Sequence, residues 1–392
     1  MNKKILLFAV IAFLAATGVS YYLFSNAGAG FAGLGAMNPA AQPTPAAGNN
    51  DYQALTFDPN QPKTQPCPLN GAMYGKDEEA WWQKHRPLGV MIENSVDARP
   101  QSGINAADIT YEAVAEGGIT RTLNVYYCQD AGIIGPVRSA RTYFVDFISE
   151  YGDHPLYAHV GGANTPGPAD ALGQIDSYGW TGYNDLNQFS IGFPTYWRDE
   201  TRQGHPVATE HTMYSTTTKL WTVAQQRGLT NVDKSGKSWD ADFTPYEFKD
   251  DAPLADRPDN QTIHVDFWDG AEYAVDWKYD KQNNDYLRYN GGQPHIDRNT
   301  HKQLTAKDIV ILYMQESHAN DGYTNNEHLL YGDKGSGDAT IFMDGTETKG
   351  MWKKADRTSR TMLYDNNGNE IKFNRGHIWF EIEPLDGEVT VK

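Results

Sequence analysis

The chain has 392 residues, a formal net charge of −17 and an aromatic content of 12%. This length allows two domains with separate hydrophobic cores, and the aromatic residues exclude a disordered chain. The acidic excess argues against nucleic acid or an anionic membrane surface as a general partner, so any anion-binding site has to be a local one.

The first 26 residues are predicted to be a membrane anchor or an export signal. Lys3 and Lys4 precede an uncharged, mainly apolar run over residues 5–24, which as a helix crosses a hydrocarbon core of about 30 Å. The lysines favour the cytoplasmic side, which places the rest of the chain outside the cytoplasm. Cleavage after Ala27 or Ala29 is the alternative and gives a secreted protein. No cysteine follows the run directly, so we expect no lipid-modified N-terminus.

Residues 27–66 are rich in Ala, Pro, Gly, Asn and Gln and are predicted to form a flexible linker. Cys67 and Cys128 are the only two cysteines of the sequence. Outside the cytoplasm this pair favours one disulfide, and two free thiols are the alternative.

Residues 67–235 are predicted to form a first domain, a mixed α/β sandwich. Strands are expected at 108–114 and 119–127, on either side of a turn at Glu116-Gly117-Gly118. A helix over 106–116 is a competing interpretation, because its Ala and Glu content suits either structure. The other expected elements are a short helix with Trp81 and Trp82, strands at 88–92 and 156–160, a helix over 142–151 with Ser139 as N-cap and Gly152 at its end, and helices over 168–178 and 215–227.

Residues 258–392 are predicted to form a second, mainly antiparallel β domain. Asp344-Gly345 and Asn367-Gly368 are typical hairpin turns. The whole chain is therefore predicted to be α+β, with the mixed α/β sandwich domain followed by the β domain. Strands are expected at 262–267, 271–279, 286–289, 309–314, 340–342, 349–353, 361–364, 370–373 and 378–382.

Two arginines surround the predicted start of the helix over 142–151. Arg138 and Arg141 lie near the positive end of the helix dipole, where a cation destabilises the helix unless negative charge is close by. An anionic ligand or an internal cluster of salt bridges can supply that charge, and the sequence leaves both open. Arginine binds phosphate or carboxylate through parallel hydrogen bonds. The predicted ligand-binding residues are Arg99, Gln101, Arg121, Arg138, Ser139, Arg141 and Arg198.

No complete catalytic constellation, cofactor motif or structural metal-ligand spacing occurs in the sequence. The candidates for proton transfer are Glu112, Glu116, His159 and His211. On one strand Glu112 and Glu116 lie about 13 Å apart, too far for a glycosidase pair, whereas on a helix they stack one turn apart. The alternative is structural: Glu112, Glu116, Asp108 and Asp146 neutralise the arginines, and His159 makes a hydrogen bond at a strand end.

Several motifs follow one another along the chain. They are 86–92, 98–103, 116–121, 135–141, the His159 step and 210–214 in the first domain, and 275–280 and 350–353 in the second. In this order they resemble the YerB-like family of proposed bacterial lipoproteins. The resemblance covers nearly everything after the linker and implies a two-domain extracytoplasmic protein, without implying an activity. The predicted anchor helix and the missing lipid-acceptor cysteine depart from the usual form of the family.

We expect a membrane-anchored envelope protein that binds an anionic cell-wall polymer or a lipid-linked precursor. The cleft is expected to be built by residues 99–141, 159–167 and 198–214. One alternative is a phosphotransferase or hydrolase that uses the same cleft. Another is a scaffold protein whose second domain docks a component of the envelope.

Overall fold

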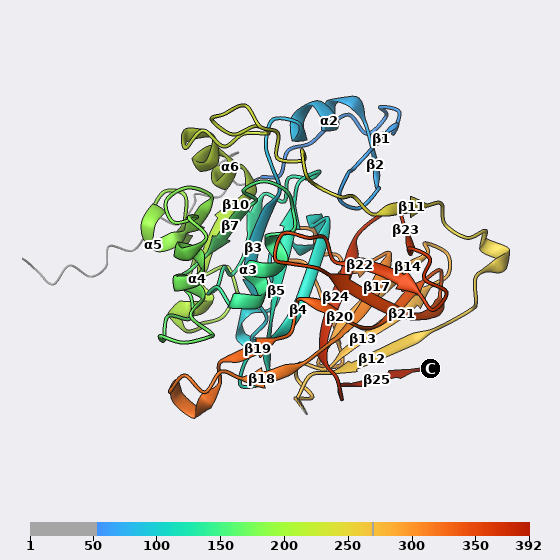
Figure 1. Cartoon of the computed structure of the whole chain (residues 1–392). Helices are drawn as coiled ribbons and strands as arrows, with labels where there is room; N and C mark the ends of the chain where they lie inside the picture. Colours follow the sequence, from blue (N-terminus) through green and yellow to red (C-terminus); the bar gives the residue numbers. More distant parts are fainter. Residues whose placement is uncertain (1–52, 269) are drawn as a thin grey trace, which may run out of the picture. The chain divides into compact units, whose positions relative to one another are not determined.

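Figure 1 shows the computed structural model, which describes residues 53–268 and 270–392. The predicted anchor and residues 27–52 of the predicted linker lie outside the described residues. No helix within the described ranges is both long and apolar enough to cross a membrane.

The main feature is a ten-stranded sheet with the strand order β22-β21-β20-β17-β24-β4-β5-β3-β7-β8. Five of its strands come from the first predicted domain and five from the second. The strands are β3 (Leu88–Glu93), β4 (Ile109–Glu116), β5 (Ile119–Tyr126), β7 (Leu156–His159), β8 (Asp185–Asn187), β17 (Asp308–Met314), β20 (Gly335–Met343), β21 (Thr346–Lys354), β22 (Met362–Asp365) and β24 (Ile378–Pro384).

The two halves of this sheet meet where β4 pairs with β24. The strands run parallel, with Ile109 opposite Ile378 and Glu112 opposite Glu381. Both strands are buried along almost their whole length, as expected of strands covered on both faces. The sheet is therefore continuous across the two predicted domains, which belong to one compact unit. We call this junction of β4 and β24 the seam.

A second, fully antiparallel sheet covers part of the large one (Figure 1). Along β13 and β14 buried and more exposed residues alternate, so one face is packed and the other reaches solvent. Trp277 of β13 contacts Trp379 of β24, with the ring centroids 5.1 Å apart. The strands of this sheet are β12 (Thr262–Asp266), β13 (Val275–Asp280), β14 (Asp285–Asn290), β15 (Gln293–Pro294), β16 (Thr305–Ala306) and β25 (Glu388–Val391).

Short helices pack around the first half of the large sheet (Figure 1). Phe147 of α3 stacks on Tyr111 of β4 at 4.8 Å between ring centroids. Ile148 lies over Gly89, where a Cβ atom would come within 2.6 Å of its Cδ1, so the close packing of α3 on β3 depends on glycine there. The α-helices are α2 (Lys76–Trp82), α3 (Thr142–Ile148), α4 (Ala171–Ser177), α5 (Gln188–Ile191) and α6 (Thr217–Gln226).

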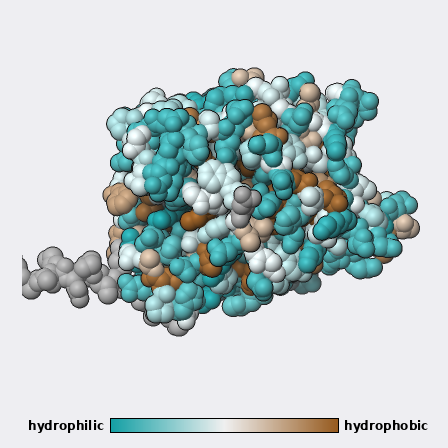
Figure 2. All heavy atoms as spheres, turned by 90° about the horizontal axis from the view of Figure 1, so that it is seen from below, coloured by the Kyte–Doolittle hydropathy of each residue, from teal (hydrophilic) through white to brown (hydrophobic). Residues whose placement is uncertain are grey.

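The remaining strands form small sheets at the periphery. Figure 2 shows one face of the molecule, which is mainly hydrophilic, with apolar side chains in small separate spots. The small sheets consist of β1 (Gln65–Pro66) with β2 (Met73–Tyr74), β6 (Ile133–Ile134) with β10 (Met213–Thr216) and β9 (Trp197–Arg198), β11 (Glu247–Lys249) with β23 (Lys372–Asn374), and β18 (Glu316–His318) with β19 (Leu329–Tyr331).

The structure is mostly sheet, with a mixed N-terminal part and mainly antiparallel C-terminal strands, of which β17 and β24 pair in parallel. The hairpin of β4 and β5 excludes a helix over 106–116, and its turn uses Gly117 and Gly118 with positive φ angles of 55° and 78°. The end of the predicted linker is not a free spacer. The Leu55 N–H donates to Asp130 and Lys63 pairs with Glu78, so these residues are held against the folded part.

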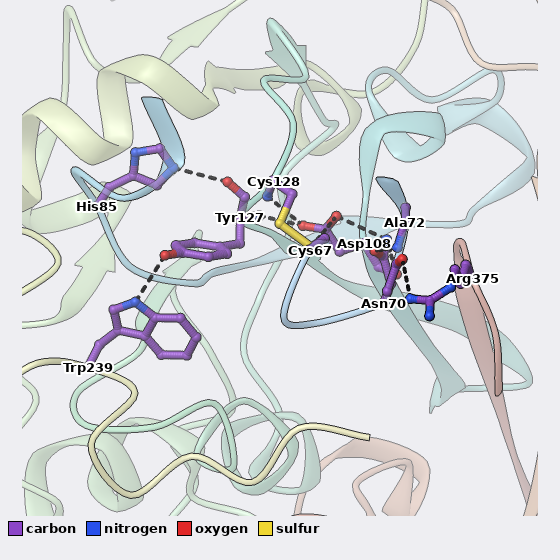
Figure 3. Close-up of a disulfide and its surroundings, with 10 residues drawn as sticks. Cys67, Asn70, Ala72, His85, Asp108, Tyr127, Cys128, Trp239 and Arg375 are labelled. Atoms are coloured by element: carbon purple, nitrogen blue, oxygen red, sulfur yellow. Dashed lines mark hydrogen bonds between the residues drawn. A yellow bond between two sulfur atoms is a disulfide. The ribbon is translucent and has the colours of Figure 1, made fainter. Parts of the chain in front are cut away.

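The predicted disulfide joins Cys67 and Cys128. Figure 3 shows Asp108 beside it, where one carboxylate oxygen accepts the N–H groups of Tyr127 and Cys128 at 2.7 and 2.9 Å. Burial raises the pKa of Asp108 to about 7, although these hydrogen bonds oppose the shift. Arg375 donates to the carbonyl of Gly71 at 3.2 Å, so the disulfide loop also contacts the chain just before β24.

Glu150 is the centre of a buried charge cluster that links α3 to the β21–β22 hairpin. Its carboxylate pairs with Lys354 at 2.8 Å and with Arg360, and it accepts a hydrogen bond from the Tyr111 hydroxyl at 2.7 Å. Burial alone raises the pKa of a carboxyl, but Lys354 and Arg360 outweigh it and lower the pKa of Glu150 to about 2. The cluster therefore keeps its charges at neutral pH.

We predict that Glu150→Gln lowers the free energy of unfolding by about 3–5 kcal/mol, because it leaves two cations buried without their anion. Because the folded pKa of Glu150 lies below the unfolded value of about 4.3, its stabilisation is complete above that value and disappears as the pH falls towards 2. The Glu150→Gln variant should lose less stability than the wild type across this window. Urea denaturation at several pH values measures both effects.

Glu247→Gln is the matched control, because Glu247 pairs with Lys372 at the surface. Its free energy of unfolding should stay within about 0.5 kcal/mol of the wild type. Equal stability of Glu150→Gln and wild type at pH 7 would contradict the structural role of this cluster.

Candidate functional site

One carboxylate neutralises Arg121 and Arg141. Glu116, at the end of β4, lies 3.1 Å from Nη2 of Arg121 and 2.6 Å from Nη2 of Arg141. Burial raises the pKa of this carboxyl, but the two guanidinium groups outweigh it and lower the pKa of Glu116. Both arginines are buried, so this half of the arginine cluster is the salt-bridge arrangement that the sequence left open.

The start of α3 differs from the prediction. Arg141, and not Ser139, is the N-cap residue, and no side chain caps the first turn. Ser139 is held upstream because its carbonyl accepts a hydrogen bond from Arg121 at 2.9 Å and the neighbouring Ala140 pairs with Gly162. The helix also ends at Ile148, before the predicted Tyr151.

Arg138 and Arg198 line one hollow, which has a volume of about 580 Å³. Arg138 lies between β6 and α3, and Arg198 ends β9. The hollow therefore joins parts of all three segments of the predicted cleft. Its other lining residues include Ser139, Gly161, Gly162, Asn164, Phe189, Thr209 and Glu210. We call it the Arg138 hollow.

Glu93, the last residue of β3, holds Arg138 and His211 together. Its Oε1 lies 3.5 Å from Nε of Arg138, and its Oε2 lies 2.9 Å from Nδ1 of His211. Within residues 53–268 and 270–392, Glu93 is the one carboxylate that pairs with Arg138. The carboxylate is buried, whereas the Arg138 side chain is 24% exposed. One buried anion thus positions both a partly exposed arginine and a histidine.

Arg198 lines the same hollow from the end of β9. Its Nη1 donates to the carbonyl of Thr209 and to the hydroxyl of Thr212. Burial lowers the pKa of Arg198, Glu210 opposes this change, and the like charge of Arg138 lowers the pKa further. Arg138 and Arg198 are therefore close enough for their like charges to interact.

His159 does not reach the hollow. It is fully buried at the end of β7, where Nε2 lies 2.6 Å from Asp185 and Nδ1 lies 2.6 Å from the carbonyl of Gly161. Both ring nitrogens therefore face protein acceptors, and the ring fixes the loop that starts at Gly161. This geometry matches the structural alternative for His159.

Glu112 has its partners away from the Arg138 hollow. Its carboxylate accepts hydrogen bonds from Thr120 at 2.6 Å and Asn94 at 3.2 Å, and it pairs with Arg288 of β14 at 2.6 Å. The prediction that Glu112 neutralises the arginines of the first domain is wrong, because it lies on the face of β4 that meets the second sheet. Asp108 accepts a hydrogen bond from the Tyr127 N–H beside the disulfide, and Asp146 pairs with Lys334.

Arg288 completes a buried network at the seam. It lies between Glu112 and Glu381, which is 3.1 Å away, and its guanidinium carbon is 4.4 Å from the ring centroid of Trp379. Burial raises the pKa of Glu381 to about 8, the neighbouring Glu112 adds to the shift, and Arg288 opposes it. Arg288 carries one positive charge and can balance only one of the two carboxyl groups. With a pKa of about 8, Glu381 keeps its proton near neutral pH.

Arg99 and Gln101, two predicted ligand-binding residues, belong to this side of the molecule. Arg99 donates to the carbonyl of Glu272 at 2.8 Å, and Gln101 accepts from His295, 2.7 Å away. His295 in turn contacts Arg288. The structure thus brings Arg138, Ser139 and Arg198 together at one hollow and places Arg99 and Gln101 at contacts between the two predicted domains.

Sequence reasoning missed Glu93, which directs both Arg138 and His211. A charged residue directly after the apolar run of β3 was the available signal, because strand ends are common places for binding residues. Arg288 was missed because nothing in its own segment indicates a buried position. Among the described residues, metal-ligand atoms come together at Cys67, Asp108 and Cys128, where the disulfide occupies both sulfurs.

Comparison with known proteins identifies the family. One family model, described as the N-terminal domain of a "Protein of unknown function (DUF3048)", matches residues 73–230, and the corresponding C-terminal model matches residues 263–380. The chain belongs to the DUF3048 family. The seam therefore joins the two regions that define this family, and we call them the N-terminal and C-terminal family regions.

The relatives support the same assignment. The chain is 28% identical over 328 residues to the "Putative lipoprotein YerB" of Bacillus subtilis (strain 168), covering 83% of this chain and 88% of that protein. It also resembles the crystal structure of YerB protein from Bacillus subtilis, with a TM-score of 0.67 and 24% identity, covering 84% of this chain and all of that one. These matches confirm the resemblance to a YerB-like family.

We predict that Glu381→Gln flattens the pH dependence of stability between about pH 4 and pH 8. The pKa of Glu381 is about 8 in the folded protein and about 4.3 in the unfolded chain. The stabilisation by protonated Glu381 is therefore complete below about pH 4 and is lost as the pH rises towards 8. Glutamine keeps the neutral shape and cannot ionise. Thermal or urea unfolding from pH 5 to pH 8 measures the slope, and parallel slopes for variant and wild type would argue against a protonated Glu381.

Proposed function

We propose that this protein binds a phosphate- or carboxylate-bearing ligand of the cell envelope in the Arg138 hollow. The observation that carries the proposal is the division of the arginine cluster. Glu116 pairs with both Arg121 and Arg141. Arg138, which pairs with Glu93, and Arg198 face a common hollow, where their like charges repel each other. An anion placed between these two guanidinium groups relieves that repulsion.

The lining suits an anion in charge and in hydrogen bonding. Arg138 and Arg198 line the hollow together with Glu210, and Glu93 pairs with Arg138 from its buried position. Guanidinium groups bind phosphate and carboxylate oxygens in pairs, and the partial burial of Arg198 strengthens such contacts by excluding water. Asn164 and Thr209 add side chains that can donate hydrogen bonds.

The envelope is proposed as the source of the ligand because of the N-terminal sequence. Residues 1–26 are predicted to export or anchor the chain, and the name of the Bacillus relative describes that protein as a lipoprotein. Cell-wall polymers and lipid-linked precursors carry phosphate or carboxylate groups. We therefore propose an extracytoplasmic, membrane-attached protein that binds such a component.

The geometry supports binding more than catalysis. Glu112 and His159 are buried, and both have protein partners. His211 is the candidate for proton transfer that shares a partner with Arg138, because Glu93 pairs with both side chains. The site thus offers cations and hydrogen-bond donors for an anion.

We predict that replacing both Arg138 and Arg198 by alanine weakens pyrophosphate binding by about tenfold or more, since a charge-assisted hydrogen bond contributes about 1.5–3 kcal/mol. Isothermal titration of the full-length protein with pyrophosphate measures the affinity. Arg375→Ala is the control, because Arg375 is partly exposed and lies beside the disulfide loop (Figure 3).

Thermal unfolding of each variant first establishes that it is folded. Unchanged affinity in a folded Arg138→Ala/Arg198→Ala protein would rule out the Arg138 hollow as the binding site. An equal loss in Arg375→Ala would instead indicate a non-specific effect of net charge.

A further inference from the structure

A second hollow lies between the two family regions and contains a different pair of arginines. Its volume is about 480 Å³. Arg202 comes from the N-terminal family region and Arg298 from the C-terminal one. The other polar lining residues that matter here are Asn105, Gln129, Asp130 and Asp297. We call it the Arg298 hollow.

The two arginines of this hollow lack a carboxylate partner. Nε of Arg202 donates to Ser102 at 2.9 Å, and its Nη2 donates to the amide oxygen of Asn299 at 2.7 Å. Neither Arg202 nor Arg298 forms an ion pair in the part of the chain that the structure describes. Burial lowers the pKa of Arg202, and the like charge of Arg298 lowers it further. Tyr214, Asp199 and Asp297 oppose this change. The pair therefore holds positive charge that the protein does not neutralise by direct contact.

Two carboxylates share the hollow but are used for other contacts. Asp297 accepts the backbone N–H groups of Asn299 at 2.8 Å and Asn105 at 3.0 Å. Asp130 accepts the N–H of Leu55 at 2.8 Å and the hydroxyl of Thr217. These contacts fix the loops that form the walls. An ionised carboxylate has about four lone-pair positions. Asp130 uses all of them, because Gly132 and Thr218 also donate to it. Asp297, which also accepts the N–H of Thr300, keeps capacity for about one further hydrogen bond.

This combination fits a ligand that carries an anionic group and several hydroxyl groups. The guanidinium groups pair with the anion, and Asp297 accepts a hydrogen bond from a hydroxyl donor. The side-chain amides of Asn105 and Gln129 can both donate and accept, as sugar hydroxyls require. An anion without hydroxyl groups gains nothing from Asp130 and Asp297 and is repelled by them.

We propose that the Arg298 hollow binds an acidic saccharide, a sugar unit that bears a carboxylate or a phosphate, and that both family regions contribute to the site. The site shares no residue with the Arg138 hollow, so it goes beyond the function proposed above. It gives the C-terminal family region a direct part in ligand binding, because Arg298 supplies half of the positive charge.

Titration of the full-length protein with glucuronate, glucose 6-phosphate and glucose tests the proposal. The two charged sugars should bind at least tenfold more tightly than glucose, and whichever binds more tightly identifies the preferred anion. Arg298→Ala should weaken binding of the charged sugars about tenfold, and Arg298→Lys should restore part of it. Because Arg298 is only partly buried, we expect these variants to fold, and thermal unfolding checks this.

The Arg138→Ala/Arg198→Ala variant separates this proposal from the first one, because it should keep full affinity at the Arg298 hollow. Affinity of Arg298→Ala equal to the wild type overturns the site. Binding of glucose as tight as that of the charged sugars overturns the role of the arginines, and binding of inorganic phosphate as tight as glucose 6-phosphate overturns the role of the hydroxyl groups.

Discussion

The parallel pairing of β4 with β24 is the constraint on which the rest of the structure depends. It places Glu112 opposite Glu381 inside the protein, where two neighbouring carboxylates are unfavourable without a cation. Arg288 supplies that cation, packed over Trp379. The seam fixes the C-terminal family region against the N-terminal one and thereby brings Arg298 to the hollow that holds Arg202.

Several buried charged groups of the first family region pair within the protein. Glu116 pairs with both Arg121 and Arg141, and Glu150 pairs with both Lys354 and Arg360. The Arg138 and Arg298 hollows are places where two guanidinium groups face one cavity. In an acidic protein such local positive sites stand out, because the overall charge repels anions elsewhere.

Local signals in the sequence predicted the local structure well, and contacts between distant segments were beyond them. The glycines after Glu116 predicted the β4–β5 hairpin, and the two cysteines predicted the disulfide. No local signal predicted the pairing of β4 with β24, because the sequence of a strand does not identify a partner strand that lies far away in the chain. For the same reason the sequence indicated neither that Arg288 neutralises Glu112 nor that Glu93 holds Arg138. The predicted cap at Ser139 failed because sheet contacts of residues 138–140 outweigh a local helix-capping preference.

We propose that Arg138 and Arg198 together hold an anion. A crystal structure of the protein grown with pyrophosphate would show whether they do. We expect a phosphate group within about 3 Å of the guanidinium nitrogens of both arginines, with Glu93 still bound to His211. An empty Arg138 hollow at a saturating concentration of pyrophosphate would contradict it.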